Sequence, residues 1–405
     1  MRGRTLVVAM CLGQVGNLLP HVVVPAVMVG HLIGPWGLSN AQAGLMASSY
    51  AAGYMVAVPV LSTLTDRMDA RRILLAGSLL SGLATIAFGL VADGLASAMV
   101  IWCVAGIGFA GAYMPGLKAL TDRLDPGDSS RSITLYTSSF SLGVGLSFLA
   151  AQLIADAWGW RLAFILTGLG PAAMVVIALL MKPVAPPPPS GRLLDFRPVL
   201  RNRTAMGYIL GYGAHCFELY GMRTWIVAFW TFVGTRHGAA TPLDPIAISV
   251  AVAVLAMPAS ILGNEVAMRI GRHRAISVIQ LASAAVALAI GLAAGTSPWL
   301  LLGLVLLYAV TVPADSGSLT SGMAASAEPR YRGATMALHS TVGFGVSALG
   351  GWLVGAALDA AGGAGNATAW FAAFAVMAGG ILCGPLVLWW SRSGTTGQQE
   401  ARGDD

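Results

Sequence analysis

The sequence predicts an all-α membrane protein in which twelve transmembrane helices form two pseudo-symmetric bundles of six. Composition, the distribution of arginine and lysine, and a weak internal repeat predict this fold. Hydrophobic residues make up 56% of the chain and charged residues only 10%, whereas soluble domains average about 45–50% and about 25%. Polar surface is too scarce for a water-soluble globule, which argues against a cytoplasmic enzyme, a disordered chain and a nucleic-acid-binding domain.

Twelve apolar segments are long enough to cross a bilayer, whose hydrocarbon core of about 30 Å needs about 20 helical residues. The first segment exceeds the apolar region of a signal peptide, so we interpret it as a spanning helix. Ser39 and Asn40 are expected to cap the second. The segments are 5–33, 41–64, 72–93, 95–118, 131–156, 160–182, 204–234, 243–268, 272–294, 297–326, 332–360 and 365–391.

The positive charges indicate the topology. With both termini placed in the cytoplasm, 20 of the 23 Lys and Arg residues fall in cytoplasmic segments. Arg161 and Arg236 fall outside, and Arg223 lies within a helix. Omitting one helix would invert every later loop, so the asymmetry supports twelve helices with cytoplasmic termini. We expect a plasma or inner membrane protein surrounded by lipid, with no nucleic-acid partner despite its net charge of +6.

The proline-rich segment 183–203 divides the chain. It contains four consecutive prolines, which favour a semi-rigid polyproline II spacer. We therefore predict bundles at 1–182 and 204–392, joined by a cytoplasmic linker. The polar tail 393–405 is expected to be disordered.

The two predicted bundles resemble each other weakly. The loop Ser62–Arg72 aligns with Asn264–Arg274 at an offset of 202 residues. A Trp-x-x-x-Phe pattern at Trp160 recurs at Trp370. Duplication of a six-helix unit explains both observations, and such repeats are common in secondary transporters.

The loop after the second helix carries a family resemblance. It is similar to Gly-x-Leu-x-Asp-Arg-x-Gly-Arg-Arg, the signature of the major facilitator superfamily, and the resemblance covers essentially the whole chain. Ser62 and Asp69 stand where that signature has glycine. The matching residues are Leu64, Asp66, Arg67 and Arg71.

The resemblance implies secondary transport by a monomer, with no enzymatic activity. It also implies that Asp66 meets the N-terminus of the eleventh helix and an arginine near the fifth, which latches the outward-open state. A carboxylate is favoured at a helix N-terminus and beside arginine. The residues expected to act in gating are Asp66, Arg67, Arg71, Lys118, Glu265 and Arg269.

Three ionisable residues, Glu218, Arg223 and Asp315, lie well inside predicted helices. Each costs about 2.5–3.5 kcal/mol on insertion scales if unpaired, so each needs a partner, water or substrate. By resemblance, the first, fourth, seventh and tenth helices line a central cavity. The candidates for substrate contact are Gln14, Asn17, His21, Tyr113, Tyr212, Arg223 and Tyr308, and those for proton coupling are His215, Glu218 and Asp315.

The roles of the buried charges have alternatives. His215 and Glu218, three residues apart, share a helix face and either relay a proton or form a structural pair. Arg223 lies about 140° around the helix from Glu218, and either binds an anionic substrate group or pairs with a carboxylate such as Asp315. Asp315 follows Pro313 in a segment expected to break its helix. It binds a proton or cation, or anchors Arg223.

The expected function is secondary active transport of a small organic solute by alternating access. An anionic substrate and a proton or other ion as co-substrate are hypotheses. The alternatives are a drug or metabolite efflux pump and, more remotely, a non-transporting receptor or a membrane-embedded enzyme. No catalytic site, cofactor or metal site is expected. The four cysteines are expected to be small buried hydrophobic residues: Cys11, Cys103, Cys216 and Cys383.

Overall fold

The computed structural model describes the chain except residues 1–2, 125–128, 186–195, 239–240, 329–330 and 393–405. The predicted tail and the four consecutive prolines lie outside the described residues. The first half of the described chain contains α1 (Gly3–Leu18), α2 (Val23–Val27), the π-helix η1 (Met28–Leu32), α3 (Asn40–Leu64), α4 (Ala70–Val91), α5 (Leu95–Thr121), α6 (Ser129–Trp158), α7 (Trp160–Gly168) and α8 (Pro171–Leu180).

The second half is also helical. Its elements are α9 (Arg197–Arg201), α10 (Arg203–His237), α11 (Pro245–Ile270), α12 (Arg272–Ala293), α13 (Pro298–Thr311), α14 (Ser316–Ser326), α15 (Arg332–Ala360) and α16 (Ala367–Arg392).

The helices are those of a protein that crosses the membrane many times. Among the described residues, ten spans are long and apolar enough to cross a bilayer, and the bent α1–α2–η1 segment makes an eleventh. Helix α10 is not among them, because its interior carries charged and polar side chains. Its 35 residues are nevertheless long enough to cross, at 1.5 Å per residue. With α10, the number of spans equals the twelve predicted.

Three predicted spans are interrupted. The first bends by 48° between α1 and α2, where Pro20 interrupts the helix. The tenth ends as α13 and resumes as α14 after Pro313, which confirms the predicted break before Asp315. The segment 160–182 was expected to be continuous, but α7 ends before Pro171 and α8 starts there, because proline has no N–H to donate to the preceding turn.

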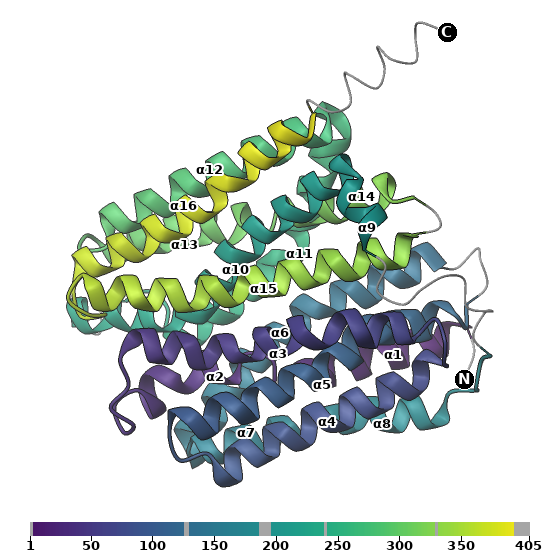
Figure 1. The fold of residues 1–405 in the computed structure, drawn as a ribbon. Helices are drawn as coiled ribbons and strands as arrows, with labels where there is room; N and C mark the ends of the chain where they lie inside the picture. The colour runs from purple at the N-terminus through teal and green to yellow at the C-terminus, as the bar shows by residue number, and fades with distance from the viewer. Residues whose placement is uncertain (1–2, 125–128, 186–195, 239–240, 329–330, 393–405) are drawn as a thin grey trace, which may run out of the picture.

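The helices form two groups that lie side by side. Figure 1 shows α1–α8 in one group and α10–α16 in the other, with the start of α1 and the end of α16 at the same end of the molecule. We call this the terminus-side end, and the opposite end the far end. Helix α3 packs against α15, and α6 against α11, across the boundary between the groups. The division at 183–203 stays a prediction.

Close helix crossings rely on glycine. A Cβ added at Gly106 of α5 would collide with the carbonyl of Tyr50 in α3, and one at Gly263 of α11 with the carbonyl of Ala314. Small residues at such crossings let helix backbones approach in a membrane, where association depends on packing. The same type of contact therefore occurs in both halves of the chain.

The cysteines differ from expectation. Cys216 is buried, whereas Cys11 and Cys103 are half-buried. Cys383 is exposed on α16, so the prediction that all four are buried was wrong. An exposed position on a spanning helix faces lipid, which accepts a weakly polar thiol.

Candidate functional site

His21 lies in the break between α1 and α2 and is 4% exposed. Its ring centroid lies 5.3 Å from that of Tyr50, 5.0 Å from Phe109 and 5.3 Å from Phe140. The hydroxyl of Tyr220, on α10, lies 3.4 Å from His21 Nε2. The bend in the first span therefore places a histidine inside a shell of aromatic rings to which both halves contribute.

Arg223 lies one turn beyond Tyr220 on α10 and is 7% exposed. Its guanidinium carbon lies 5.5 Å from the Tyr220 ring centroid and 5.9 Å from that of Phe140. Within the described chain, no carboxylate lies within 4.0 Å of the guanidinium. The alternative in which Asp315 pairs with Arg223 is therefore not found in this structure.

A small cavity of about 30 Å³ lies between the two halves at this level. Its wall includes two of the predicted substrate-contact residues, His21 and Arg223, and hydroxyl groups from three helices. Each buried water needs about 10–15 Å³ by this measure, so the cavity holds only a few waters in this conformation. The lining residues are His21, Val22, Pro25, Ala47, Ser48, Tyr50, Ala51, Tyr220, Arg223, Thr224 and Ser347.

The other candidates in the first half do not line this cavity. Gln14 is fully buried, and its Oε1 accepts a 2.8 Å hydrogen bond from the Tyr136 hydroxyl. Tyr113 stacks on Phe109 with centroids 5.9 Å apart. Asn17 is 1% exposed, and both polar atoms of its side chain lack a hydrogen-bond partner among the described residues. Gln14 Nε2 also lacks a partner among the described residues, so Gln14 keeps part and Asn17 all of its side-chain hydrogen-bonding capacity.

Asp315 and His215 form a buried contact in the second half. Asp315 Oδ1 lies 2.7 Å from His215 Nδ1, outside hydrogen-bond geometry, and both side chains are 1% exposed. Gln280 donates a 2.8 Å hydrogen bond to Asp315 Oδ2. On its other side, the His215 ring stacks on Tyr212, which also stacks on His339.

Glu218 has a separate environment. Its Oε1 accepts hydrogen bonds from Ser283 at 2.8 Å and from Tyr308 at 3.0 Å. Oε2 is buried with no partner in the part of the chain that the structure describes. The expected contact between His215 and Glu218 does not occur. Tyr308, expected to contact substrate, instead donates its hydroxyl to Glu218.

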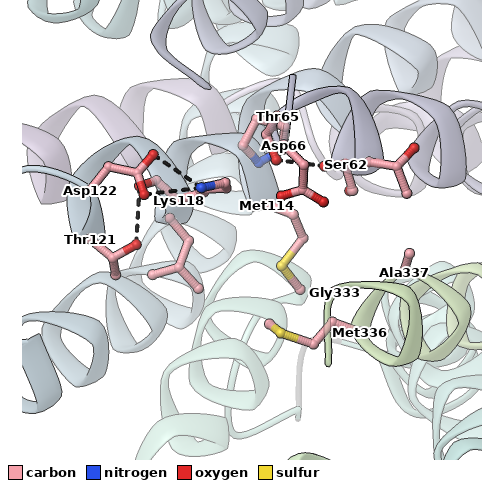
Figure 2. Close-up of a pocket in the computed structure, with 13 residues that line it drawn as sticks. Ser62, Thr65, Asp66, Met114, Lys118, Thr121, Asp122, Gly333, Met336 and Ala337 are labelled. Atoms are coloured by element: carbon pink, nitrogen blue, oxygen red, sulfur yellow. Dashed lines mark hydrogen bonds and ion pairs between the residues drawn. The ribbon is translucent and has the colours of Figure 1, made fainter. Parts of the chain in front are cut away.

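A second cavity of about 340 Å³ lies at the terminus-side end, between α3, α5 and α15. Figure 2 shows Asp66 beside it, with Gly333 and Met336 of α15 across from Lys118 and Asp122. Asp66 Oδ2 lies 3.7 Å from the position of a Cβ at Gly333, near the N-terminus of α15, as the resemblance implied. Burial raises the pKa of the Asp66 carboxyl. The positive charge of Lys118 lowers this pKa, and the negative charge of Asp122 raises it.

Asp69 binds Arg123, an arginine between α5 and α6; the expected pairing of Asp66 with an arginine near the fifth span stays a prediction. Arg123 Nη2 donates to both carboxylate oxygens of Asp69, at 2.8 and 2.9 Å. The backbone N–H groups of Val184 and Arg71 each donate to Asp69 at 3.0 Å. Asp69, which replaces a signature glycine, therefore ties α4, α5 and the start of the linker together.

The expected gating ion pairs are not formed across the two halves. Lys118 pairs with Asp122 of its own helix at 3.0 Å. Arg67, Glu265 and Arg269 are exposed and make no ion pair with another described residue. Their gating roles stay predictions.

The sequence did not predict the shell of aromatic rings around His21. Tyr50, Phe109 and Phe140 lie singly in apolar helices, where they resemble any packing residue. Tyr220 offered a signal, because it lies three residues from Arg223 and therefore on the same helix face.

Comparison with known proteins gives the family. The model of the Major Facilitator Superfamily matches residues 10–351. The chain belongs to this superfamily. It is therefore an integral membrane transporter and not an enzyme.

Solved structures of superfamily members have the same fold. A bacterial homolog of the human lysosomal transporter spinster, in an inward-facing and unoccupied conformation, has a TM-score of 0.72 at 18% identity, over 96% of this chain and 95% of that one. The nucleoside transporter NupG has a TM-score of 0.72 at 15% identity, over 95% and 99%. At these identities the similarity shows the fold alone.

Sequence relatives match only in part. Human spinster homolog 1 is 22% identical over 48% of this chain, and human monocarboxylate transporter 11 is 28% identical over 46%. The probable sulfoacetate transporter of Cupriavidus necator is 29% identical over 33%. The matches span 39%, 38% and 30% of those proteins, so their substrates do not transfer to this superfamily member directly.

Proposed function

We propose that this superfamily transporter moves a small organic anion by alternating access across a plasma or inner membrane, with both termini in the cytoplasm. The observation that carries the proposal is Arg223, a buried guanidinium at the boundary between the halves with no carboxylate partner in the described chain. An unpaired arginine in a spanning helix costs about 2.5–3.5 kcal/mol on insertion scales. A bound anion would offset this cost.

The surroundings of Arg223 suit an anion with an apolar body. The guanidinium offers a planar fork of donors that matches carboxylate geometry. The rings of Tyr220 and Phe140 already pack near it, and aromatic faces accept apolar groups. Two of the sequence relatives are named for anions, monocarboxylates and sulfoacetate, which supports the same substrate class.

The buried carboxylates support proton coupling. Glu218 is fully buried with one oxygen unpartnered in the described chain, and a bound proton removes the cost of burying its charge. Asp315 contacts His215, and histidine is a common proton shuttle in proteins. We assign proton binding to these three residues and anion binding to Arg223.

Thermal unfolding of the purified protein with a metabolite library tests the proposal. A ligand at 100 times its Kd adds about 2.7 kcal/mol to the folded state. Carboxylates or sulfonates should raise the Tm of the wild type. Arg223→Gln should lose this shift, whereas Arg236→Gln, which removes an exposed charge from the same helix, should keep it.

A different class of stabilising ligand would contradict the proposal. Stabilisation by bulky hydrophobic cations alone, unchanged in Arg223→Gln, would replace anion transport with the efflux alternative. Glu218 and Asp315 would then be the substrate-binding charges.

A further inference from the structure

Asp359, near the end of α15, caps the start of α3. Its Oδ1 accepts hydrogen bonds from the Asn40 backbone N–H at 3.0 Å and from the Asn40 amide group at 2.7 Å. Its Oδ2 accepts from the Ala41 N–H at 2.7 Å. The first N–H groups of a helix lack partners within that helix, so a side chain from one half supplies what a helix of the other half needs.

This contact lies at the far end of the molecule, where α3 and α15 pack closely against each other. A Cβ added at Gly44 of α3 would collide with the carbonyl of Gly351 in α15, and one at Gly355 with the carbonyl of Asn40. Two backbones this close leave no passage between α3 and α15. Separation of α3 from α15 at this end would break the hydrogen bonds to Asp359.

The other end of the same helix pair has the reversed arrangement. Helices α3 and α15 run antiparallel, so the end of α3 lies beside the start of α15 (Figure 1). Asp66 follows α3, 3.7 Å from the position of a Cβ at Gly333 in the first turn of α15, and it makes no hydrogen bond to that turn. The 340 Å³ cavity lies beside this position.

We propose that Asp359 and Asp66 are alternating latches: Asp359 caps α3 and holds the far end closed, and Asp66 caps α15 when the terminus-side end closes. Each is a carboxylate at the N-terminus of a helix in the other half, a charge-assisted contact that the helix dipole favours. The inference rests on alternating access but not on the proposed substrate. The superfamily resemblance implies a role for Asp66; the role of Asp359 and the exchange between the two residues are new.

Two pairs of spin labels test the exchange in a variant without native cysteines. Ala96→Cys with Thr368→Cys reports the far end, and Arg72→Cys with Arg274→Cys reports the terminus-side end. All four positions are exposed, and each pair joins the two halves. Distances are measured by double electron–electron resonance in nanodiscs without added substrate, so a failure of the anion proposal does not affect the result.

Asp359→Asn should shift the population roughly tenfold towards longer far-end and shorter terminus-side distances, a factor that corresponds to about 1.4 kcal/mol. Asp66→Asn should shift it in the opposite direction. Asp244→Asn is the matched control, because Asp244 caps α11 within its own half, by accepting from the Ala247 N–H. It should change neither distance.

Asn40→Pro gives an independent test should Asp359→Asn fold poorly. It removes both donors that Asn40 offers to Asp359, while Ser39 still caps α3. Ser39 is extended (φ −71°, ψ 163°), as the residue before proline prefers, and proline suits the first helical position. It should reproduce the shift of Asp359→Asn. Unchanged distances in both variants, or an equal shift in Asp244→Asn, would overturn the proposal.

Discussion

Glu218 and Arg223 lie five residues apart on α10 but have different surroundings. Glu218 accepts two hydroxyl hydrogen bonds within the second half, whereas Arg223 faces the cavity between the halves. A carboxylate whose hydrogen-bond partners all lie in one half suits proton coupling, because these partners move together with the carboxylate during alternating access. A charge between the halves suits substrate binding, because alternating access exposes it to either side.

Glu218→Gln should abolish the dependence of uptake on a pH gradient. A gradient of one pH unit is worth about 1.4 kcal/mol per proton, or about tenfold in accumulation, and glutamine carries no exchangeable charge. It keeps an oxygen that can accept from Ser283 and Tyr308. Uptake into proteoliposomes with and without the gradient measures the effect. Asp93→Asn, at an exposed carboxylate, should behave as wild type, and retained coupling in Glu218→Gln would eliminate Glu218 as a carrier.

The charge of Asp69 should make the free energy of unfolding depend on pH in the acidic range. Burial alone raises the pKa of Asp69, but hydrogen bonds from Arg123, Val184 and Arg71, together with the charge of Arg123, lower it below 3.8. Because the folded pKa lies below the unfolded value of about 3.9, the stabilisation is fully present above about pH 5 and is lost as the pH falls through the folded pKa.

Asp69→Asn isolates this charge, because asparagine also caps helices. It should cost about 1–3 kcal/mol at pH 7, typical of a hydrogen-bonded charge, and the difference in Tm from wild type should shrink below about pH 4. Melting in detergent, followed by tryptophan fluorescence at pH 7, 5 and 3.5, measures it. A difference that stays constant across this range would contradict the pKa argument.

The sequence predicted which charged residues lie inside the spanning helices, but it did not predict which side chains they contact. Glu218, Arg223 and Asp315 stand out because charges are rare in apolar helices. Ser283, a partner of Glu218, and Gln280, a partner of Asp315, belong to α12, where neither differs from other small or polar residues. Which rotation of α12 faces α10 depends on packing of whole helices, so neighbours along the chain suggested the wrong pair, His215 with Glu218.

Among the elements, glycine crossings should be the most sensitive to added volume. Gly106→Ala places a methyl group on the Tyr50 carbonyl and should cost about 1–3 kcal/mol, as overpacking does. Gly303→Ala, in α13 with open space around it, should be neutral or stabilising, since alanine is the better helix former. Tm in detergent measures both. Equal Tm values for the two variants would contradict the close approach of α3 and α5.

Element boundaries followed from apolar length and helix caps. Ser39 caps α3, as predicted, whereas Asn40 is the first residue of the helix and the capping box with Gln42 was not predicted. Prolines do not always interrupt a helix. Pro20, Pro171 and Pro313 coincide with breaks, whereas Pro59 and Pro115 lie inside continuous helices. Neighbouring helices decide whether a freed carbonyl finds a partner, and the sequence alone does not contain that information.

For the whole molecule, the charge asymmetry predicts cytoplasmic termini. A C-terminal fusion to green fluorescent protein should fluoresce, and the same fusion to alkaline phosphatase should be inactive, because 20 of 23 positive residues then lie on the cytoplasmic side. The reverse pattern would invert the orientation, and the far end would then face the cytoplasm.

Flux through the reconstituted protein is the most direct test of the central claim, that this superfamily member transports an organic anion bound by Arg223. Proteoliposomes should take up the carboxylate or sulfonate that stabilises the protein best, and Arg236→Gln should retain that uptake. Arg223→Gln should reduce uptake to the level of protein-free liposomes. Wild-type uptake by Arg223→Gln, or no uptake of any stabilising anion by the wild type, would contradict the account.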